Sequence, residues 1–395
     1  MKTIIKTLAI TGLASTAFTT HAADIKNTEF QYGGYIKLDA IFNQYSDSQR
    51  ASATVGDDFL VPSTIPVGDG SGEGDQNFDS NAKFSRLFFK TTTATDAGNV
   101  KGYIEMDFNG GNDERLTNQS STGLRHAFFS WDNTDNSSLL SGQTWSTFFN
   151  VGALPEALDF IGPTSGTLFV RQSQFRYTQG LGGGKLMIAA ENPSVGLYDA
   201  GVDDSATVTF SNNIDSSSRP DLVARYDGKA SMLSYSAATV LREIRYALGT
   251  TDESEEAFAI SLSGKLAFSN GDDLKFMYSQ GTLGRYLALN AYRDAAVEDD
   301  GSIELIESSG GFIAYRHIWS DKWRSTLSHA FSSADNPDNL VADATKSVNN
   351  SYINLIYSPT KKLSFGGEYM MASREVESGA DGDLTKIQFM SKWAF

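Results

Sequence analysis

The sequence contains no cysteine, few prolines and no long apolar run beyond its first residues. Without cysteine there is no disulfide framework, and thiol or cysteine-ligated metal chemistry is excluded. No later stretch approaches the roughly 18 apolar residues with which a helix spans a bilayer. Positive charge is also in deficit, since the formal net charge is −16, and this argues against nucleic acid as a partner. A membrane β-barrel stays possible, because its strands need only about 9–11 residues of alternating polarity.

Residues 1–23 have the pattern of a secretory signal peptide. Lys2 and Lys6 precede the apolar run Leu8–Phe18, and small residues follow it. We expect cleavage after Ala22 or Ala23, which takes the net charge of the exported chain to about −18. No repeat or change of composition divides the rest, so residues 24–395 are expected to form one domain.

Alternating polarity is the strongest pattern in that domain. The stretch Val100–Phe108 shows it most clearly, with Ile104 and Met106 on one face and Lys101 and Glu105 on the other. About sixteen such stretches occur, and short turns alternate with longer polar connections between them. Barrels of the outer membrane have short periplasmic turns and long extracellular loops. The sequence therefore predicts an all-β fold, a transmembrane antiparallel β-barrel of about 16 strands in the bacterial outer membrane.

The last stretch, Leu384–Phe395, is expected to close the barrel. Ile387, Phe389, Trp393 and Phe395 fall on its apolar face. Because lipid offers no hydrogen bonds, the last strand must pair with the first, which we place at Gly34–Phe42. An aromatic C-terminus of this kind resembles the closing strand by which outer-membrane barrels engage the barrel-assembly machinery. Outer-membrane lipid and lipopolysaccharide are the expected surroundings.

One long connection, residues 149–165, is apolar where the others are polar. Leu154, Leu158 and Ile161 have helical spacing, which predicts a short amphipathic helical turn. Such a turn needs a surface for its apolar side, and the inner barrel wall offers one. We expect this segment to fold into the lumen as a constriction loop, with Glu156 and Asp159 facing the channel. The alternative is a surface helix packed against a neighbouring loop or subunit.

Basic residues recur on the face opposite the apolar one. The candidates for the pore lining are Arg86, Lys101, Arg125, Arg176, Arg225, Arg316 and Arg324, with Arg171 at the point where the apolar segment rejoins the wall. Arg125, Arg171 and Arg176 are nearest that segment and are predicted to favour anions at the narrowest point, because an arginine fork binds carboxylates bidentately. Alternatively, these arginines only neutralise wall carboxylates such as Glu105 and Glu191.

Acidic residues gather in the predicted outer loops and account for the negative total. They include six carboxylates within residues 57–79. Within these, Asp69–Asp75 could hold a divalent cation such as Ca²⁺, but it lacks the full spacing of a calcium-binding loop, so a solvated acidic loop is the favoured interpretation. No cofactor and no metal site are predicted.

Several motifs together resemble the DcaP-like porins, a family of trimeric outer-membrane channels of Gram-negative bacteria. They are G-Y-I-K-L-D-A (Gly34–Ala40), F-S-R-L-F-F-K-T (Phe84–Thr91), K-G-Y-I-E-M-D-F (Lys101–Phe108), L-R-H-A-F (Leu124–Phe128), G-Q-T-W-S-T-F (Gly142–Phe148), L-D-F-I-G-P (Leu158–Pro163), R-Q-S-Q-F-R-Y-T (Arg171–Thr178), A-E-N-P (Ala190–Pro193) and N-L-I-Y-S-P (Asn354–Pro359). The resemblance implies a sixteen-stranded homotrimer that imports small anionic solutes, dicarboxylates among them.

The leading functional hypothesis is passive diffusion of small anionic solutes through a water-filled, arginine-lined channel. An unselective general porin is the alternative, and an adhesin or receptor barrel ranks lower. An outer-membrane hydrolase ranks lower too, because a Ser/His pair needs a histidine near its nucleophile. Beyond the signal segment the chain has His126, His317 and His329, all in predicted strands and expected on the outward face. No enzyme activity is predicted.

Overall fold

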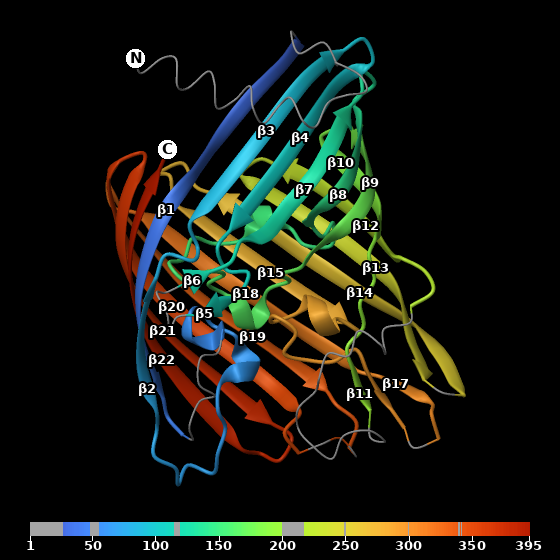
Figure 1. The fold of residues 1–395 in the computed structure, drawn as a ribbon, viewed down its shortest axis with the longest axis vertical. Helices are drawn as coiled ribbons and strands as arrows, with labels where there is room; N and C mark the ends of the chain where they lie inside the picture. Colours follow the sequence, from blue (N-terminus) through green and yellow to red (C-terminus); the bar gives the residue numbers. More distant parts are fainter. Residues whose placement is uncertain are drawn as a thin grey trace.

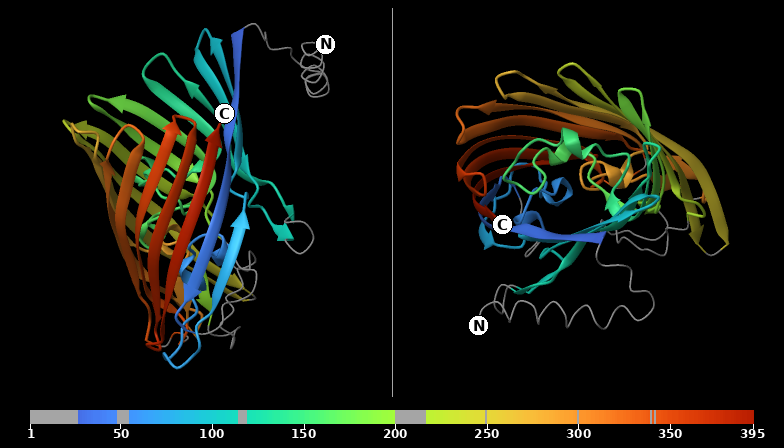
Figure 2. Two further views of the ribbon diagram at one scale, coloured as in Figure 1. Left: turned by 90° about the vertical axis from the view of Figure 1, so that its left-hand side faces the viewer. Right: turned by 90° about the horizontal axis from the view of Figure 1, so that it is seen from above.

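The computed structural model describes residues 27–47, 55–113, 119–199, 217–248, 250–298, 300–338, 340 and 342–395. These residues form one antiparallel sheet that closes into a barrel, drawn from the side in Figure 1 and from above in Figure 2. The predicted signal peptide, residues 1–23, lies outside the described residues.

The wall consists of seventeen strands in sixteen positions within the described residues. The strands are β1 (Thr28–Tyr45), β2 (Gln76–Asn81), β3 (Arg86–Thr95), β4 (Gly98–Asp107), β7 (Gly123–Asp132), β8 (Ser137–Trp145), β9 (Arg171–Leu181), β10 (Gly184–Glu191), β12 (Asp221–Ala230), β13 (Leu233–Leu248), β14 (Thr251–Ala267), β15 (Asp273–Gly281), β18 (Glu307–Ile318), β19 (Trp323–Asp335), β20 (Thr345–Thr360), β21 (Leu363–Val376) and β22 (Asp381–Ala394). β2 pairs with one half of β1 and β3 with the other, so these two share a position. The predicted number of strands is confirmed.

Closure occurs between the last strand and the first. β22 pairs antiparallel with β1 along eleven residue pairs, from Tyr35 opposite Ala394 to Tyr45 opposite Leu384. Ile36 lies opposite Trp393, so apolar side chains of both strands share the outer face. The predicted closing strand is therefore confirmed, and this edge of the sheet is satisfied by backbone hydrogen bonds.

Side chains alternate between an apolar outer face and a polar interior. On β1, Ile36, Leu38 and Phe42 are about half exposed, whereas Lys37 and Asp39 are buried. In a bilayer the exposed apolar face meets lipid, as the alternation predicted. Among the described residues, no helix is long and apolar enough to cross a membrane.

The two ends of the barrel differ in the length of their connections. At the end where both β1 begins and β22 finishes, turns of a few residues join β3 to β4, β7 to β8, β9 to β10, β12 to β13, β14 to β15, β18 to β19 and β20 to β21. This short-turn end is uppermost in Figure 1. The long connections leave from the opposite end and carry the short strands β5 (Asn112–Asp113), β6 (Gln119–Ser120), β11 (Leu197–Asp199), β16 (Ala295–Val297) and β17 (Ile303–Leu305).

An irregularity in the wall changes the face of one histidine. The pairing of β4 with β7 shifts register between Glu105 and Met106, which leaves Arg125 as an extra residue. His126 lies opposite Glu105, is only 7% exposed, and its Nδ1 is 3.0 Å from the hydroxyl of Thr144. The expectation that His126 faces outward is wrong, because the bulge resets the alternation that the sequence suggested.

Candidate functional site

The connection between β8 and β9, residues 146–170, contains no α-helix. It has two short 3₁₀ turns, Val151–Ala153 and Thr164–Gly166, with bends between them. The predicted helical turn over Leu154–Ile161 is therefore wrong. Pro155 offers no backbone N–H, and the N–H groups of Leu158 and Asp159 donate to the Glu368 carboxylate, at 2.8 and 3.1 Å, instead of to a preceding turn.

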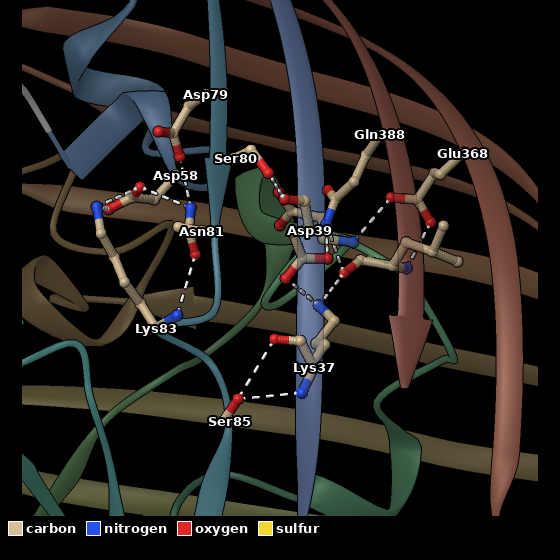
Figure 3. A network of polar contacts seen from close by, with 12 residues as sticks. Lys37, Asp39, Asp58, Asp79, Ser80, Asn81, Lys83, Ser85, Glu368 and Gln388 are labelled. Carbon is tan, nitrogen blue, oxygen red and sulfur yellow. Dashed lines mark hydrogen bonds and ion pairs between the residues drawn. The ribbon is translucent and has the colours of Figure 1, made fainter. Parts of the chain in front are cut away.

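The second half of this segment, residues 158–165, is bonded to wall strands far away in sequence. The carbonyl of Leu158 accepts from Lys37 Nζ at 2.7 Å and from Gln388 Nε2 at 3.0 Å. Asn350 on β20 accepts from the N–H of Ser165 at 3.0 Å and donates to the carbonyl of Gly162 at 2.8 Å. Figure 3 shows Lys37, Asp39, Gln388 and Glu368 gathered at this contact. Side chains of β1, β20, β21 and β22 thus hold the backbone of this half.

Asp159 completes that attachment as a buried ion pair. Its carboxylate lies 2.6 Å from Lys386 Nζ, with side-chain exposures of 0% and 1%, and accepts the N–H of Leu60 at 3.0 Å. Leu158 packs beside it against Ile356 and Met390 of the wall. The expectation that Asp159 faces the channel is wrong, because the whole carboxylate is used to fasten the segment.

The first half of the segment is held by three cations of the wall. Arg225 donates to the carbonyl of Phe149 at 2.8 Å, and Lys275 donates to the carbonyl of Leu154 at 2.6 Å. Arg324 binds the Glu156 carboxylate with two nitrogens, each at 2.7 Å. Unlike Asp159, the Glu156 side chain keeps 29% of its surface exposed. In Figure 2 (right) the ribbon of residues 146–170 lies within the ring of strands. That it narrows the channel stays a prediction.

A second connection, residues 282–297, supports the first, although it is not singled out in the sequence analysis. Leu283, Tyr286 and Leu287 are fully buried. The N–H of Phe169 donates to the carbonyl of Tyr286, and that of Ala288 donates to Thr167, both at 3.1 Å. The mostly apolar stretch from Leu283 to Tyr292, which only Arg285 and Asn290 interrupt with strongly polar side chains, is the signal that could have revealed it.

The arginines predicted to line the pore form two groups. Arg86, Arg125 and Arg171 belong to the first, beside the aromatic rings of Phe160 and Trp145. Arg125 is 2% exposed and bridges Glu105 at 2.8 Å and Asp107 at 2.7 Å, so its charge is neutralised. Arg86 lies 3.7 Å from Glu105. Arg171 stacks over Trp145 and has no carboxylate partner among the described residues.

Arg176 belongs to the second group, nearer the short turns. It donates to Gln174 at 2.9 Å and to the carbonyl of Trp145 at 3.3 Å, with no carboxylate partner in the described part of the chain. Arg225 pairs with Asp227 at 2.6 Å, Arg316 with Asp273 at 2.5 Å, and Lys101 with Asp132. The predicted residues thus do not gather at one place, since they are spread around the interior and several are neutralised.

Cations nevertheless outnumber carboxylates in the short-turn half of the interior. Strand alternation and register give the interior face these basic residues: Lys90, Lys101, Arg176, Lys185, Arg225, Lys229, Lys265, Lys275, Arg316, Arg324 and Lys392. The carboxylates on the same face are Glu29, Asp132, Asp227, Asp273 and that of Glu156. Local charge in this half is therefore positive although the whole chain is acidic.

The acidic connection gives no sign of a metal site. Asp69 accepts from the backbone N–H of Ser71 at 3.0 Å, an arrangement typical of a solvated turn. No group of three or more histidine, aspartate or glutamate side chains within the described ranges is arranged to hold a metal ion.

A closed sixteen-position barrel with an apolar outer face and a charged, polar interior defines an outer-membrane channel protein of the porin class. The family model of the DcaP outer membrane protein matches residues 4–395. The chain therefore belongs to the DcaP outer membrane protein family, whose members are channels.

Solved structures agree on the fold. The outer membrane channel DcaP of Acinetobacter baumannii superimposes with a TM-score of 0.76 at 24% identity, covering 94% of this chain and 98% of that one. The anion-selective porin from Comamonas acidovorans gives 0.58 at 11% identity, with 93% and 100% covered. A loop-deletion mutant of OmpT from Vibrio cholerae gives 0.55 at 12%, with the same coverage. Comparison with curated proteins gave no match.

Proposed function

We propose that the protein lets small anionic solutes diffuse passively across the outer membrane, and that residues 146–170 narrow its lumen. The observation that carries the proposal is the surplus of cations on the interior face of the short-turn half. Arg176, Lys275 and Lys392 have no carboxylate partner among the described residues. Unneutralised cations in a narrow, partly desolvated passage raise the local concentration of anions and repel cations.

The family resemblance supports the finer parts of the proposal. Dicarboxylates as solutes and a homotrimeric assembly are expectations from the family, and engagement of the assembly machinery by the C-terminal strand is an expectation from outer-membrane barrels in general. The porin of Comamonas acidovorans is described as anion-selective, which agrees with this proposal but shares only the fold. An unselective general porin is the competing hypothesis, since Arg125, Arg225 and Arg316 are neutralised.

The reversal potential of the purified protein in a planar bilayer under a KCl gradient separates these two hypotheses. We expect anion preference for the wild type. The double variant Lys275→Gln/Lys392→Gln should lower the anion-to-cation permeability ratio, roughly fourfold for each charge, because a unit charge about 10 Å away contributes about 0.4 kcal/mol in water, favourable for the anion and unfavourable for the cation. A wild type with no ion preference would support the unselective porin, and cation preference would overturn the proposal.

A further inference from the structure

The Glu156–Arg324 pair joins a wall arginine to a carboxylate from a connection, as the pair of Arg242 with Asp294 also does, but only the Glu156–Arg324 pair of these two stays partly exposed. Asp227 and Asp273 are wall residues that neutralise wall arginines. Glu156, in contrast, comes from residues 146–170 and reaches Arg324 on β19, 168 residues further along the chain. The pair is bidentate, so the carboxylate occupies the whole fork that a solute carboxylate would use.

The fork is held in position without help from Glu156. The Nη1 of Arg324 donates to the hydroxyl of Ser358 at 2.8 Å, and that hydroxyl lies 2.8 Å from Ser364. An arginine oriented by the wall loses little conformational freedom when its carboxylate partner is exchanged.

The backbone of Glu156 is likewise fixed without the ion pair. Its carbonyl accepts from Asn354 Nδ2 at 3.2 Å and from the hydroxyl of Tyr352 at 3.3 Å. The neighbouring carbonyl of Leu154 accepts from Lys275. The segment therefore stays attached when the Glu156 side chain turns away from Arg324, and only that side chain has to move.

Further cations surround the pair. Arg316 and Lys392 act electrostatically on the Glu156 carboxylate, and Glu156 acts in turn on Lys275. Asp273, which also acts electrostatically on Lys275, is engaged by Arg316. The positive charge around Glu156 thus exceeds what one carboxylate neutralises, which leaves room for a second negative charge.

Exposure makes an exchange of carboxylates feasible. Arg324 and Glu156 keep 22% and 29% of their side-chain surface exposed. Separating a partly solvated pair costs little compared with separating a buried one, because water solvates both separated charges.

We propose that Arg324, Lys275 and Lys392 form a binding station for solute carboxylates on the short-turn side of residues 146–170, and that Glu156 is its tethered competitor. A carboxylate of the solute takes the place of Glu156 in the Arg324 fork, and a second carboxylate, where present, meets Lys275 or Lys392. This inference rests on the proposed anion passage. It adds a defined binding position for the solute. Because Glu156 competes for this position, the affinity for the solute stays low and the solute can leave again.

The test measures interruptions of single-channel current by succinate in planar bilayers for wild type, Glu156→Gln and Arg324→Gln. In Glu156→Gln no carboxylate competes for Arg324. The succinate concentration for half-maximal block should therefore fall about fivefold, which corresponds to the free energy of about 1 kcal/mol that a partly exposed ion pair contributes. Arg324→Gln should raise the succinate concentration for half-maximal block, both alone and in combination with Glu156→Gln. Glu156→Asp, with the charge kept and the tether shortened, should lie between wild type and Glu156→Gln.

The matched control is Asp227→Asn, which removes one carboxylate from an arginine pair in the same half of the lumen. An equal fall in the blocking concentration for Asp227→Asn and Glu156→Gln would overturn the station, since net charge alone would then explain block. Unchanged block in Glu156→Gln would also overturn it. Both outcomes leave anion preference intact, whereas cation preference of the wild type in a KCl gradient would refute the proposed function itself. Unchanged conductance in KCl confirms that the segment keeps its place in each variant.

Discussion

Two ion pairs formed by one short segment show how burial decides what a charge does. Asp159 pairs with Lys386 and Glu156 pairs with Arg324. The two acidic residues are three positions apart, and the closest nitrogen–oxygen distances of the pairs are 2.6 and 2.7 Å. The first pair is at most 1% exposed, whereas the second keeps a fifth or more of each side chain in contact with solvent. Two carboxylate–cation pairs of one segment therefore differ in burial, and only the Glu156 carboxylate stays accessible to solvent.

The energetic difference follows from desolvation. Removing one partner of a buried pair leaves an uncompensated charge and typically costs about 3–5 kcal/mol. A solvated pair is worth about 1 kcal/mol or less. Asp159 also accepts the N–H groups of Leu60 and Ile161, so no part of its carboxylate is available to a solute. Variants of the buried pair should consequently change the attachment of the segment, whereas variants of the solvated pair should change the binding of solutes.

The largest effect is expected for Lys386→Met. The variant leaves the Asp159 carboxylate buried without its cation and should destabilise the attachment of residues 158–165 by about 3–5 kcal/mol. We expect a detached segment, and hence a clearly larger and noisier single-channel conductance in KCl. The control is Lys346→Met, since the pair of Lys346 with Glu375 is exposed and lies on strands near the long loops. Equal conductance of Lys386→Met and wild type would show that the buried pair does not hold the segment.

An intermediate effect is expected for Gly166→Ala, which tests the packing of the same attached half. A Cβ at this position would lie 1.9 Å from the carbonyl oxygen of Gly311 on β18. The backbone of Gly311 cannot easily move away, because it is paired within the sheet. Overpacking of this kind costs about 1–3 kcal/mol. The apparent melting temperature, followed by circular dichroism, should fall and conductance should fluctuate more. Gly183→Ala is the control, because its Cβ would meet no atom within 4 Å. A wild-type melting curve for Gly166→Ala would mean that the turn is loosely packed.

The sequence predicts the wall well and the interior poorly, for a physical reason. Alternation is a local property, and it correctly placed the strands, the apolar outer face and the closing strand Leu384–Phe395. The helical spacing of Leu154, Leu158 and Ile161 is local too, but the helical turn that it predicts does not form. The N–H groups there are satisfied by Glu368, about 210 residues away, and no window of sequence contains that partner.

The candidate residues illustrate the same limit. Strand alternation predicts which face of the sheet each basic side chain occupies. Whether each is neutralised depends on register between strands and on bulges. Arg125 is neutralised because a bulge brings it to Glu105 and Asp107, whereas Arg176 meets only an amide and a carbonyl. The buried state of Asp159 depends on Lys386 from the last strand, which closure alone brings near.

The smallest effect, and the sharpest test of the comparison, comes from salt. Raising ionic strength from 0.1 to 1 M shortens the Debye length from about 10 to about 3 Å, which screens solvated charges and hardly affects buried ones. Anion preference and the difference in succinate block between Glu156→Gln and wild type should both shrink at 1 M KCl. The excess conductance of Lys386→Met, expressed relative to bulk conductivity, should persist. If salt reduced both differences alike, the two pairs would share one solvated environment, and burial would not separate an anchoring carboxylate from an exchangeable one.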